Sequence, residues 1–465
     1  MPDGGEYGVW KAAGFPSTSP EDNIDYGAYF SISSPSSTWY PVAGNRNYGS
    51  GSLDGIGYSG AYWSVTTSDN PASTYAQSYV LSFDSSNVFL TSLCSRASGC
   101  SIRCLKEGSE PKYDNTFSVS GAKNLSSEGT ANSYVVSKVG TYSISAVKGN
   151  SNVAIGSVTS AEVLWESYGT DKIITKGQLI KGAKYQNGNV YFKTSDTFKE
   201  GNAVIAVKDA SGAVLWSWHI WLTDQPQEQV YNNNAGIMMD RNLGATSATS
   251  GDVGALGLLY QWGRKDPFLG SSSISSNGKT AKSTSPWPSP VSSDSQTGTI
   301  GYATAHPTTF IIVNDSNYDW YYTGTEITDK TSRQSEKTIY DPCPLGWRVP
   351  DGGNEGVWSV ALGPDAYDDT YTYDDVNEGI DLSGKFGVDP TIWYPASGYR
   401  SSLVGTQGPV GTVTYVANYG YYWSVTPNNH YAYGLRISVT GYVDPSYKTS
   451  ERKYGYSVRC LQVID

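Results

Sequence analysis

The sequence predicts a mainly β protein with some α structure, and composition is the first evidence. The 465 residues include 51 Gly, 37 Tyr and 14 Trp, and only 16% of them are charged. Aromatic residues favour strands, Gly and Ser favour turns, and the charged residues that favour helices are scarce. Short aromatic and β-branched segments separated by turn residues supply the second observation, because this pattern is typical of strands joined by many turns.

Sequence blocks that occur twice, in the same order, supply the third observation. The pairs are residues 2–14 and 350–363, Trp39–Arg46 and Trp393–Arg400, Gly60–Thr66 and Gly420–Thr426, and Gly99–Leu105 and Gly455–Leu461. An ordered set of this kind predicts a duplicated domain. Residues 231–349 precede the second copy without a counterpart ahead of the first. We therefore expect the sequence to begin inside a longer protein, with any leader upstream.

The segment between the two copies has a different character. Its strand-like runs are Thr141–Val147, Ala161–Ser167, Val190–Thr194, Ala203–Asp209 and Val214–Leu222. Asn187–Gly188 is a type I′ hairpin signal, since both residues tolerate positive φ. In the last run Trp216 and Trp218 share a face that we expect to lie against a second sheet, while His219 lies on the opposite, polar face. The pattern predicts an immunoglobulin-like β-sandwich.

The charge balance restricts the partners. A net charge of −11 and a pI near 4.9, with no basic cluster, argue against binding of nucleic acid or of anionic membranes. No uninterrupted apolar run is long enough to cross a bilayer, so direct membrane insertion is not expected. The acidic excess is consistent with a soluble surface. Together with the Gly-, Tyr- and Ser-rich composition, it favours an extracellular or cell-surface protein.

The C-terminal half contains a series of motifs, DRNLGA, YQWGRKDPF, CPLGWRVP, YWSVT and GYSVRC. At these motifs the chain resembles the Fibrobacter succinogenes major paralogous domain. The resemblance implies a complete C-type-lectin-like α+β domain over 228–465, on a scaffold similar to that of formylglycine-generating enzymes. Residues 1–108 resemble only its C-terminal half, which places the immunoglobulin-like sandwich, 109–227, between a partial and a complete domain. The sandwich resembles one found in surface proteins of gut Bacteroidetes, many of which are implicated as pilus-tip or adhesin subunits.

The resemblance also implies a disulfide between Cys343 and Cys460, because lectin-like folds commonly join the corresponding regions. The alternative is a pair of buried, reduced thiols. In the first copy Cys104 occupies the position of Cys460, whereas Cys94 and Cys100 are additions. The separation of Cys94 and Cys100 permits a local bridge, which would leave Cys104 free.

Catalytic motifs are scarce. Formylglycine-generating enzymes require reactive cysteines in an open pocket, and residues 228–465 contain only Cys343 and Cys460, both at positions that look structural. His219, His306 and His430 lie in different segments and at no zinc-binding spacing. No GxSxG motif accompanies them. The sequence therefore predicts a protein that is not an enzyme, with a formylglycine-generating-like enzyme as the least favoured alternative.

Acidic residues gather in one segment and raise the question of calcium. The candidates are Asp365, Asp368, Asp369, Asp374 and Asp375. Calcium requires six to eight oxygen ligands, several of which clustered Asp residues can supply. However, the spacing differs from that of a DxDxDG loop, and Tyr residues are interleaved. The sequence predicts no cofactor, and calcium bound by this loop is the alternative to a solvated acidic surface.

The segment from Tyr415 to Tyr456 is the predicted binding surface. Its candidate ligand-binding residues are Tyr421, Tyr422, Asn428, Asn429, His430, Tyr431 and Tyr433. Tyr offers a rigid amphipathic contact and Asn an adaptable hydrogen bond, as in antibody paratopes. The alternative is that the Tyr residues only cover the sheet. Some proteins on the lectin-like scaffold carry a deliberately diversified C-terminal segment, and this region resembles it.

The sequence therefore predicts a cell-surface adhesin or pilus-tip-type protein that recognises a glycan or protein of a host or bacterial surface. Pilus subunits are further expected partners. The alternative is a structural or spacer module of surface filaments or of the envelope.

Overall fold

The computed structural model describes residues 22–24, 27–33, 36–68, 76–104, 112–275, 279–313, 318–322, 337–363, 371–402 and 411–463. Strands account for 41% of the chain and helices for 5%, which confirms the mainly β class. The chain divides into two compact units, Met1–Lys112 and Tyr113–Asp465, which we describe separately.

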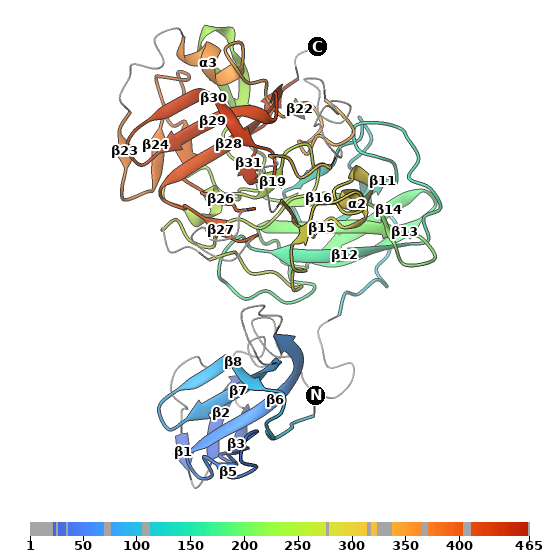
Figure 1. Cartoon of the computed structure of the whole chain (residues 1–465). Helices are drawn as coiled ribbons and strands as arrows, with labels where there is room; N and C mark the ends of the chain where they lie inside the picture. The colour runs from blue at the N-terminus through green and yellow to red at the C-terminus, as the bar shows by residue number, and fades with distance from the viewer. Residues whose placement is uncertain are drawn as a thin grey trace. The chain divides into compact units, whose positions relative to one another are not determined.

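The described residues of the first unit form three small sheets (Figure 1). Their strands are β1 (Asp22–Ile24), β2 (Gly27–Ser33) and β3 (Ser36–Pro41); β4 (Asn45–Arg46) and β5 (Leu53–Asp54); and β6 (Ser59–Ser68), β7 (Gln77–Asp84) and β8 (Val88–Ser95). Tyr40, Tyr62 and Phe83 lie at the centre of a core that also contains apolar residues of β7 and β8. The rings of Tyr40 and Tyr62 meet edge to face, 4.8 Å apart.

Residues 113–222 of the second unit form two four-stranded sheets that face each other. One sheet contains β10 (Ser133–Val136), β16 (Val214–Leu222), β15 (Gly201–Lys208) and β12 (Ser160–Ser167); the other contains β13 (Ile180–Gln186), β14 (Asn189–Thr194), β11 (Thr141–Ser145) and β9 (Lys123–Asn124). Asn187 and Gly188 join β13 to β14 with φ of 49° and 77°, as the hairpin signal predicts. Trp216 and Trp218 of β16 enter the core between the sheets.

The opposite face of β16 is buried as well, so the prediction that His219 lies on a polar face was wrong. The imidazole is buried between Ser133 Oγ, 2.9 Å from Nδ1, and Asn202 Oδ1, 2.8 Å from Nε2. Trp221, on the same face, belongs to a core shared with Met239 and Leu243 of the C-terminal part. This face is buried because residues that follow the sandwich pack against it.

His219 gives the protein a predicted acid sensitivity. Burial lowers the pKa of His219 to about 3. In the unfolded chain, histidine has its ordinary pKa of about 6.5. The unfolded chain therefore binds a proton between these pH values and the folded chain does not. The free energy of unfolding should lose about 1.4 kcal/mol per pH unit from this group as the pH falls from 6 to 4.

Urea unfolding at several pH values tests this, with His219→Gln expected to show a shallower loss. His430→Gln is the control, because His430 is exposed. Equal slopes for the wild-type protein and His219→Gln would refute the prediction.

The C-terminal part is organised around a seven-stranded sheet, in which β19 pairs with β31. Its strands are β27 (Val413–Thr414), β26 (Tyr399–Arg400), β31 (Gly455–Ser457), β28 (Tyr419–Asn428), β29 (Tyr431–Ser438), β30 (Val443–Glu451) and β19 (Leu259–Gln261). A four-stranded sheet contains β17 (Glu228–Tyr231), β18 (Gly236–Met239), β32 (Leu461–Gln462) and β22 (Trp347–Arg348). Smaller elements are β20 (Val291–Ser292), β21 (Ile311–Ile312), β23 (Tyr373–Asp374), β24 (Gly379–Asp381), β25 (Trp393–Pro395), η1 (Asn232–Asn234), η2 (Val253–Ala255), α2 (Ile300–Ala305) and α3 (Val357–Leu362).

The two sequence copies contain the same local structure. The three-stranded meander β6–β8 of the first corresponds to β28–β30 of the second, each with a bulge after the shared Trp. Gly44 and Gly398 both have φ of 64°. The same side-chain hydrogen bonds recur at matched positions, from Tyr62 to Pro41 O (2.7 Å) and Tyr422 to Pro395 O (2.6 Å), and from Arg103 to Trp39 O and Arg459 to Trp393 O (2.6 Å each). Among the shared residues, Tyr40 and Tyr62 of the first copy and Tyr394 and Tyr422 of the second belong to the core of their copy.

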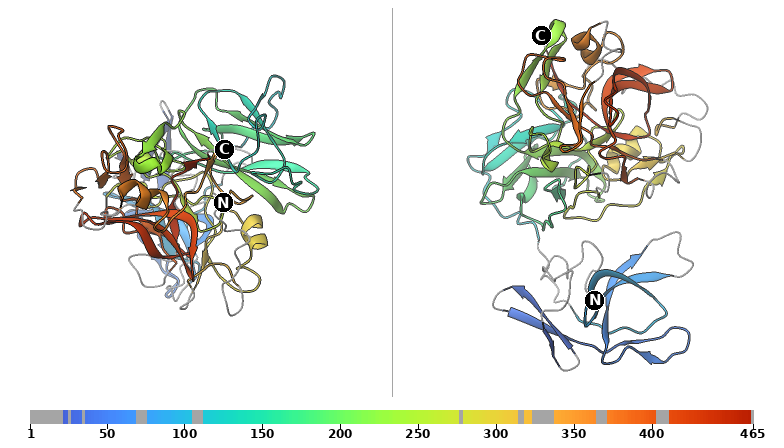
Figure 2. Two further views of the ribbon diagram at one scale, coloured as in Figure 1. Left: turned by 90° about the horizontal axis from the view of Figure 1, so that it is seen from above. Right: turned by 90° about the vertical axis from the view of Figure 1, so that its left-hand side faces the viewer.

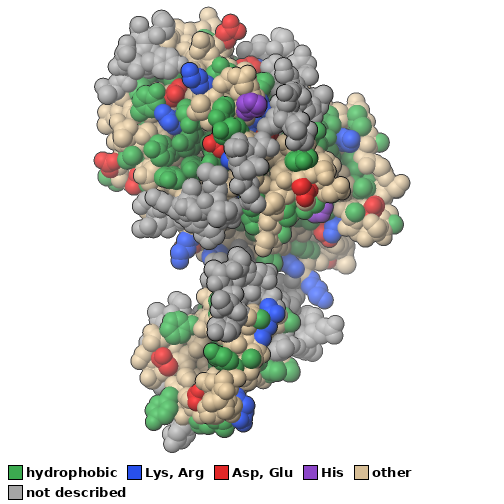
Figure 3. Space-filling view, in the orientation of Figure 1, with side chains coloured by type: hydrophobic (Ala, Val, Ile, Leu, Met, Phe, Trp, Pro, Cys, Tyr) green, Lys and Arg blue, Asp and Glu red, His purple; other side chains and the backbone are tan. Residues whose placement is uncertain are grey.

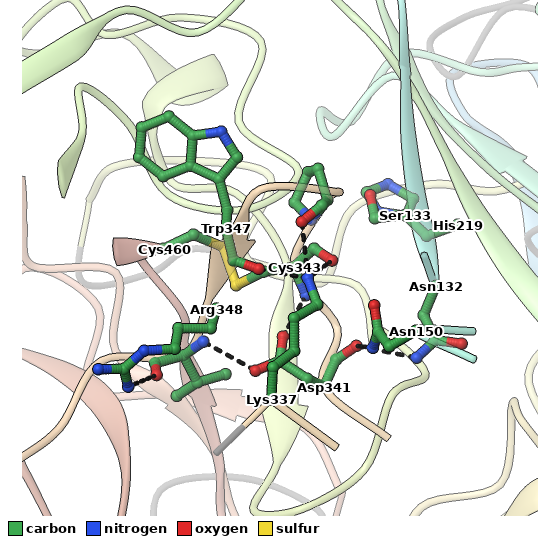
Figure 4. Close-up of a disulfide and its surroundings, with 12 residues drawn as sticks. Asn132, Ser133, Asn150, His219, Lys337, Asp341, Cys343, Trp347, Arg348 and Cys460 are labelled. Atoms are coloured by element: carbon green, nitrogen blue, oxygen red, sulfur yellow. Dashed lines mark hydrogen bonds between the residues drawn. A yellow bond between two sulfur atoms is a disulfide. The ribbon is translucent and has the colours of Figure 1, made fainter. Parts of the chain in front are cut away.

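The predicted disulfide between Cys343 and Cys460 is confirmed (Figure 4). Next to it, the carboxylate of Asp341 accepts the backbone N–H groups of Cys343 and Val349 at 2.8 and 2.9 Å. Burial raises the pKa of Asp341. The Asp341 carbonyl accepts the side-chain amides of Asn132 and Asn150 from the sandwich, at 2.8 and 3.2 Å. The DPCP segment therefore fastens the C-terminal part to the sandwich.

The YQWGRKDPF motif makes a second connection to the sandwich. Lys265 Nζ donates to Ser217 O of β16 at 3.0 Å and to Asp266 at 2.6 Å, and the hydroxyl of Ser217 donates to Asp266 at 2.6 Å. Lys265 also lies 4.6 Å from the centre of the Trp216 ring. Burial lowers the pKa of Lys265. Figure 2 shows the strands of residues 113–222 (cyan and green) beside those of the C-terminal part (yellow to red).

Candidate ligand-binding surface

One face of the seven-stranded sheet is covered with tyrosine. We call this set of side chains the tyrosine platform, and its members are Tyr399, Tyr415, Tyr419, Tyr421, Tyr447, Tyr454 and Tyr456. They come from β26, β28, β30, β31 and adjoining residues, which the sheet brings side by side. Along β28, Tyr419, Tyr421 and Trp423 point to this face because successive side chains of a strand alternate.

The inner rings of the platform form a packed floor. Tyr456 stacks on Trp423 with ring centres 4.2 Å apart and on Tyr421 with ring centres 4.7 Å apart. All three side chains are buried. Burial raises the pKa of Tyr421 and of Tyr456 above the ordinary tyrosine value, so both phenols are neutral near pH 7. The Trp423 indole donates to Tyr260 O of β19 at 2.7 Å, which anchors the floor below.

The outer rings are partly exposed. Tyr399 and Tyr415 stack with ring centres 5.6 Å apart, Tyr419 lies 5.8 Å from Tyr415, and Tyr447 lies 5.7 Å from Tyr421. Figure 3 shows hydrophobic side chains gathered over the strands of this sheet. Such a surface offers ring faces for stacking and hydroxyl groups for hydrogen bonds.

A positive charge lies at the edge of the platform. The guanidinium of Arg436, which faces Tyr421 across the β28–β29 ladder, lies 4.4 Å from the centre of the Tyr447 ring. Asp444 is opposite Arg436 on β30. Burial raises the pKa of Asp444, while Arg436 acts in the opposite direction. Tyr and Arg together are typical of the energetically dominant residues of binding surfaces.

The platform tyrosines are specific to the second copy. The matched positions of the first copy hold Asn45, Gly55, Ser59, Ala61, Ser98 and Cys100 in place of Tyr399, Tyr415, Tyr419, Tyr421, Tyr454 and Tyr456, in that order. The same backbone hydrogen bond fixes the alignment, from Gly44 to Ser59 O (2.9 Å) and from Gly398 to Tyr419 O (2.8 Å). The local fold therefore forms without these rings.

Tyr415 adds a conformational argument. It has φ of 56°, in the left-handed region, where the first copy has Gly55 with φ of 75°. Glycine adopts this region freely, whereas a bulky residue there is strained. Strain of this kind is concentrated at functional sites. A tyrosine at this position therefore costs stability that glycine would not.

The tip of the β28–β29 hairpin contains several of the residues predicted from the sequence. Asn429 and His430 are exposed there, and Asn428 donates to Lys448 O at 2.6 Å. Arg452 holds the tip from below by donating to Asn429 O at 2.8 Å and Tyr431 O at 3.0 Å. The tip is thus positioned by a charged side chain under it.

Two of the predicted ligand-binding residues lie elsewhere. Tyr422 is fully buried and donates its hydroxyl to Pro395 O at 2.6 Å. Its assignment as a ligand contact was wrong, because it points to the opposite face of β28 from Tyr421. Tyr433 is partly exposed and lies over Gly353, away from the platform. The sequence reasoning did not single out Tyr399 or Tyr415 as candidates; the available signal was their replacement in the first copy.

Of the five acidic residues that are candidates for calcium binding, Asp365, Asp368 and Asp369 lie outside the described residues. Asp374 accepts the backbone N–H groups of Val376 and Asn377, both at 2.9 Å, and these hydrogen bonds help to lower its pKa. Asp375 is exposed. Within the described ranges, no three His, Cys, Asp or Glu residues are grouped so that they could hold a metal ion.

The remaining cysteines are in the first unit. Cys94 and Cys100 are free thiols with sulfurs 3.6 Å apart, so the local bridge considered from the sequence is not formed. The hydrogen bond with Cys100 is the main cause that lowers the pKa of Cys94 to about 6. Cys104 is free and exposed.

Comparisons with protein-family models, with curated proteins and with solved structures find no match to this chain. None of the helices in the described part of the chain has the length and apolar character needed to span a membrane.

Proposed function

We propose that this protein is a non-enzymatic cell-surface adhesin, of the kind found at pilus tips, that recognises a glycan or a protein through the tyrosine platform. In this proposal an immunoglobulin-like sandwich carries a C-type-lectin-like domain of the Fibrobacter succinogenes major paralogous type. The observation that carries it is the platform itself. Its tyrosines are absent from the first copy, which has the same local fold.

Physical chemistry supports a saccharide or a protein surface as ligand. The ring faces of Tyr399 and Tyr415 can stack on the C–H face of a pyranose or on an aromatic side chain, and their hydroxyls can bond to polar groups. Tyr has few rotatable bonds, so it loses little entropy when a ligand binds. The stacked floor beneath holds the outer rings in place, which further reduces the cost of ordering.

The alternatives have less support. A formylglycine-generating-like enzyme needs free thiols, and Cys343 and Cys460 are both consumed by their disulfide. The hydrogen-bonded junction between the sandwich and the C-terminal part is compatible with a spacer module. That role gives no reason for a strained tyrosine at position 415.

Binding of the whole protein to a mixed glycan and protein array, with and without EDTA, tests the proposal. The informative variant is Tyr399→Asn, Tyr415→Gly and Tyr419→Ser combined, because it installs the residues of the first copy. We expect it to weaken binding on the order of a hundredfold, or about 3 kcal/mol for three partly exposed rings. Its free energy of unfolding should change by less than about 1 kcal/mol, since the fold tolerates these residues.

Tyr191→Ala on β14 is the matched control, because Tyr191 is also a partly exposed strand tyrosine. It should bind like the wild-type protein. Unchanged binding by the triple variant would exclude the platform as the site. Absence of binding by the folded protein on the array would favour the spacer alternative. Loss of binding in EDTA would indicate that binding requires calcium.

A further inference from the structure

The first copy leaves exposed the apolar positions that the second copy buries. Ile102 is 56% exposed, whereas the matched Val458 is 2% exposed. Leu53 and Ile56 are each 55% exposed, against 8% for Val413 and 1% for Val416 at the same positions. Cys104 is exposed, whereas Cys460 is buried in its disulfide. We call Leu53, Ile56, Cys100, Ile102 and Cys104 the acceptor face.

In the second copy, a single stretch of sequence covers these positions. β19 pairs with β31 through Tyr260 and Tyr456, and Leu259 packs on Val413 and Val416. Cys343 supplies the disulfide to Cys460. The covering residues all belong to 236–349, whose sequence occurs once in this chain.

The two copies also differ in the backbone hydrogen bonds at these positions. In the second copy, Leu243 N donates to Val458 O at 2.8 Å and Met239 N donates to Cys460 O at 3.0 Å. Among the residues that the structure describes, none donates a backbone hydrogen bond to the matched carbonyls of Ile102 and Cys104. An open strand edge beside exposed apolar side chains favours addition of another strand.

We propose that the acceptor face binds a polypeptide segment with the pattern of residues 236–349, and that Cys104 is its covalent anchor. The segment provides a strand like β19 that pairs along residues 99–101, apolar side chains that cover Leu53, Ile56 and Ile102, and a cysteine in the place of Cys343. The anchor is a disulfide. Its formation removes two protons and two electrons from the thiols, and a disulfide oxidant such as oxidised glutathione accepts them and becomes two molecules of reduced glutathione. This interaction is independent of the tyrosine platform.

The experiment uses residues 231–349 of this chain as the probe. They are joined ahead of Pro2, because Pro2 matches Pro350 in the sequence. The fusion protein is folded in a glutathione buffer, and its disulfides are mapped by mass spectrometry of proteolytic peptides. We expect a bond between Cys104 and the cysteine of the added segment, with Cys104 no longer labelled by maleimide.

A second fusion keeps the test independent of the covalent bond. With Cys343→Ser made only in the added segment, Cys104 should remain a thiol but react with maleimide at least about tenfold more slowly than in the original chain, because the segment still covers it. Leu259→Asp, made only in the added segment of this second fusion, is the matched control and should restore fast labelling. Labelling of Cys104 at its original rate in both the first and the second fusion, or a bridge between Cys104 residues of two copies, would overturn the proposal.

Discussion

Replacement of both Cys343 and Cys460 by alanine is expected to lower the free energy of unfolding of residues 113–465 by about 4–5 kcal/mol. The bond joins residues that are 117 apart in sequence. A cross-link over a loop of that length strongly restricts the unfolded chain. Both cysteines are buried, and alanine leaves no unpaired polar group in their place. Urea unfolding without a reductant measures the effect.

The matched control is Cys94→Ala combined with Cys100→Ala, because these thiols are close but are not joined by a disulfide. It should change the stability of its unit by less than about 1 kcal/mol. Ligand binding gives a second readout, since Cys460 follows shortly after the platform residues Tyr454 and Tyr456. A cost below about 1 kcal/mol for the Cys343 and Cys460 pair would show that the bond does not limit the unfolded chain as the loop-entropy model requires.

The β28 strand shows both the reach and the limit of reasoning from sequence. Enrichment in Tyr and Asn drew attention to the segment, but it selected Tyr421 and Tyr422 together. Alternation along a strand places them on opposite faces, and only one of these faces borders the platform. The alternation of side chains along β28 could be read from the sequence. Which of the two faces packs on α3 and its neighbours could not. Tyr422 belongs to that core.

The platform as a whole could not be assembled from composition. Tyr399, Tyr421 and Tyr456 come from β26, β28 and β31, which are neighbours in the sheet but distant along the chain. Composition and local period report on single strands, whereas the platform depends on their order. The duplication offered a further signal, because the core tyrosines recur in both copies and the platform tyrosines do not.

The burial of the outer face of the sandwich could not be predicted from the sequence either. The inward positions of β16 were predicted correctly, since one apolar face is enough to specify them. The pattern of one strand could not show that a second layer covers the other face, which contains His219 and Trp221. Trp221 was the available signal, because a tryptophan on a solvent-facing strand position is unusual.

Trp221→Ala is expected to cost about 3–5 kcal/mol, the largest effect of a single substitution that we predict. The ring is fully buried, and its indole N–H donates to Ala245 O in the C-terminal part at 2.9 Å. Removal leaves a cavity at the junction and an unpaired carbonyl. Because the same junction supports the platform from behind, we expect weaker ligand binding together with the lower urea midpoint.

Trp221→Phe separates the two contributions, since it retains most of the apolar contact and loses only the hydrogen bond, at a cost of about 1–3 kcal/mol. If Trp221→Ala unfolds with a cost below about 1 kcal/mol, the sandwich and the C-terminal part behave as independent modules. The platform would then be carried on a loosely attached domain, and the rigid junction could no longer account for its preorganisation. A large cost with a single unfolding transition would instead make the sandwich an integral part of the binding domain, because the face of β16 that holds Trp221 completes the C-terminal core.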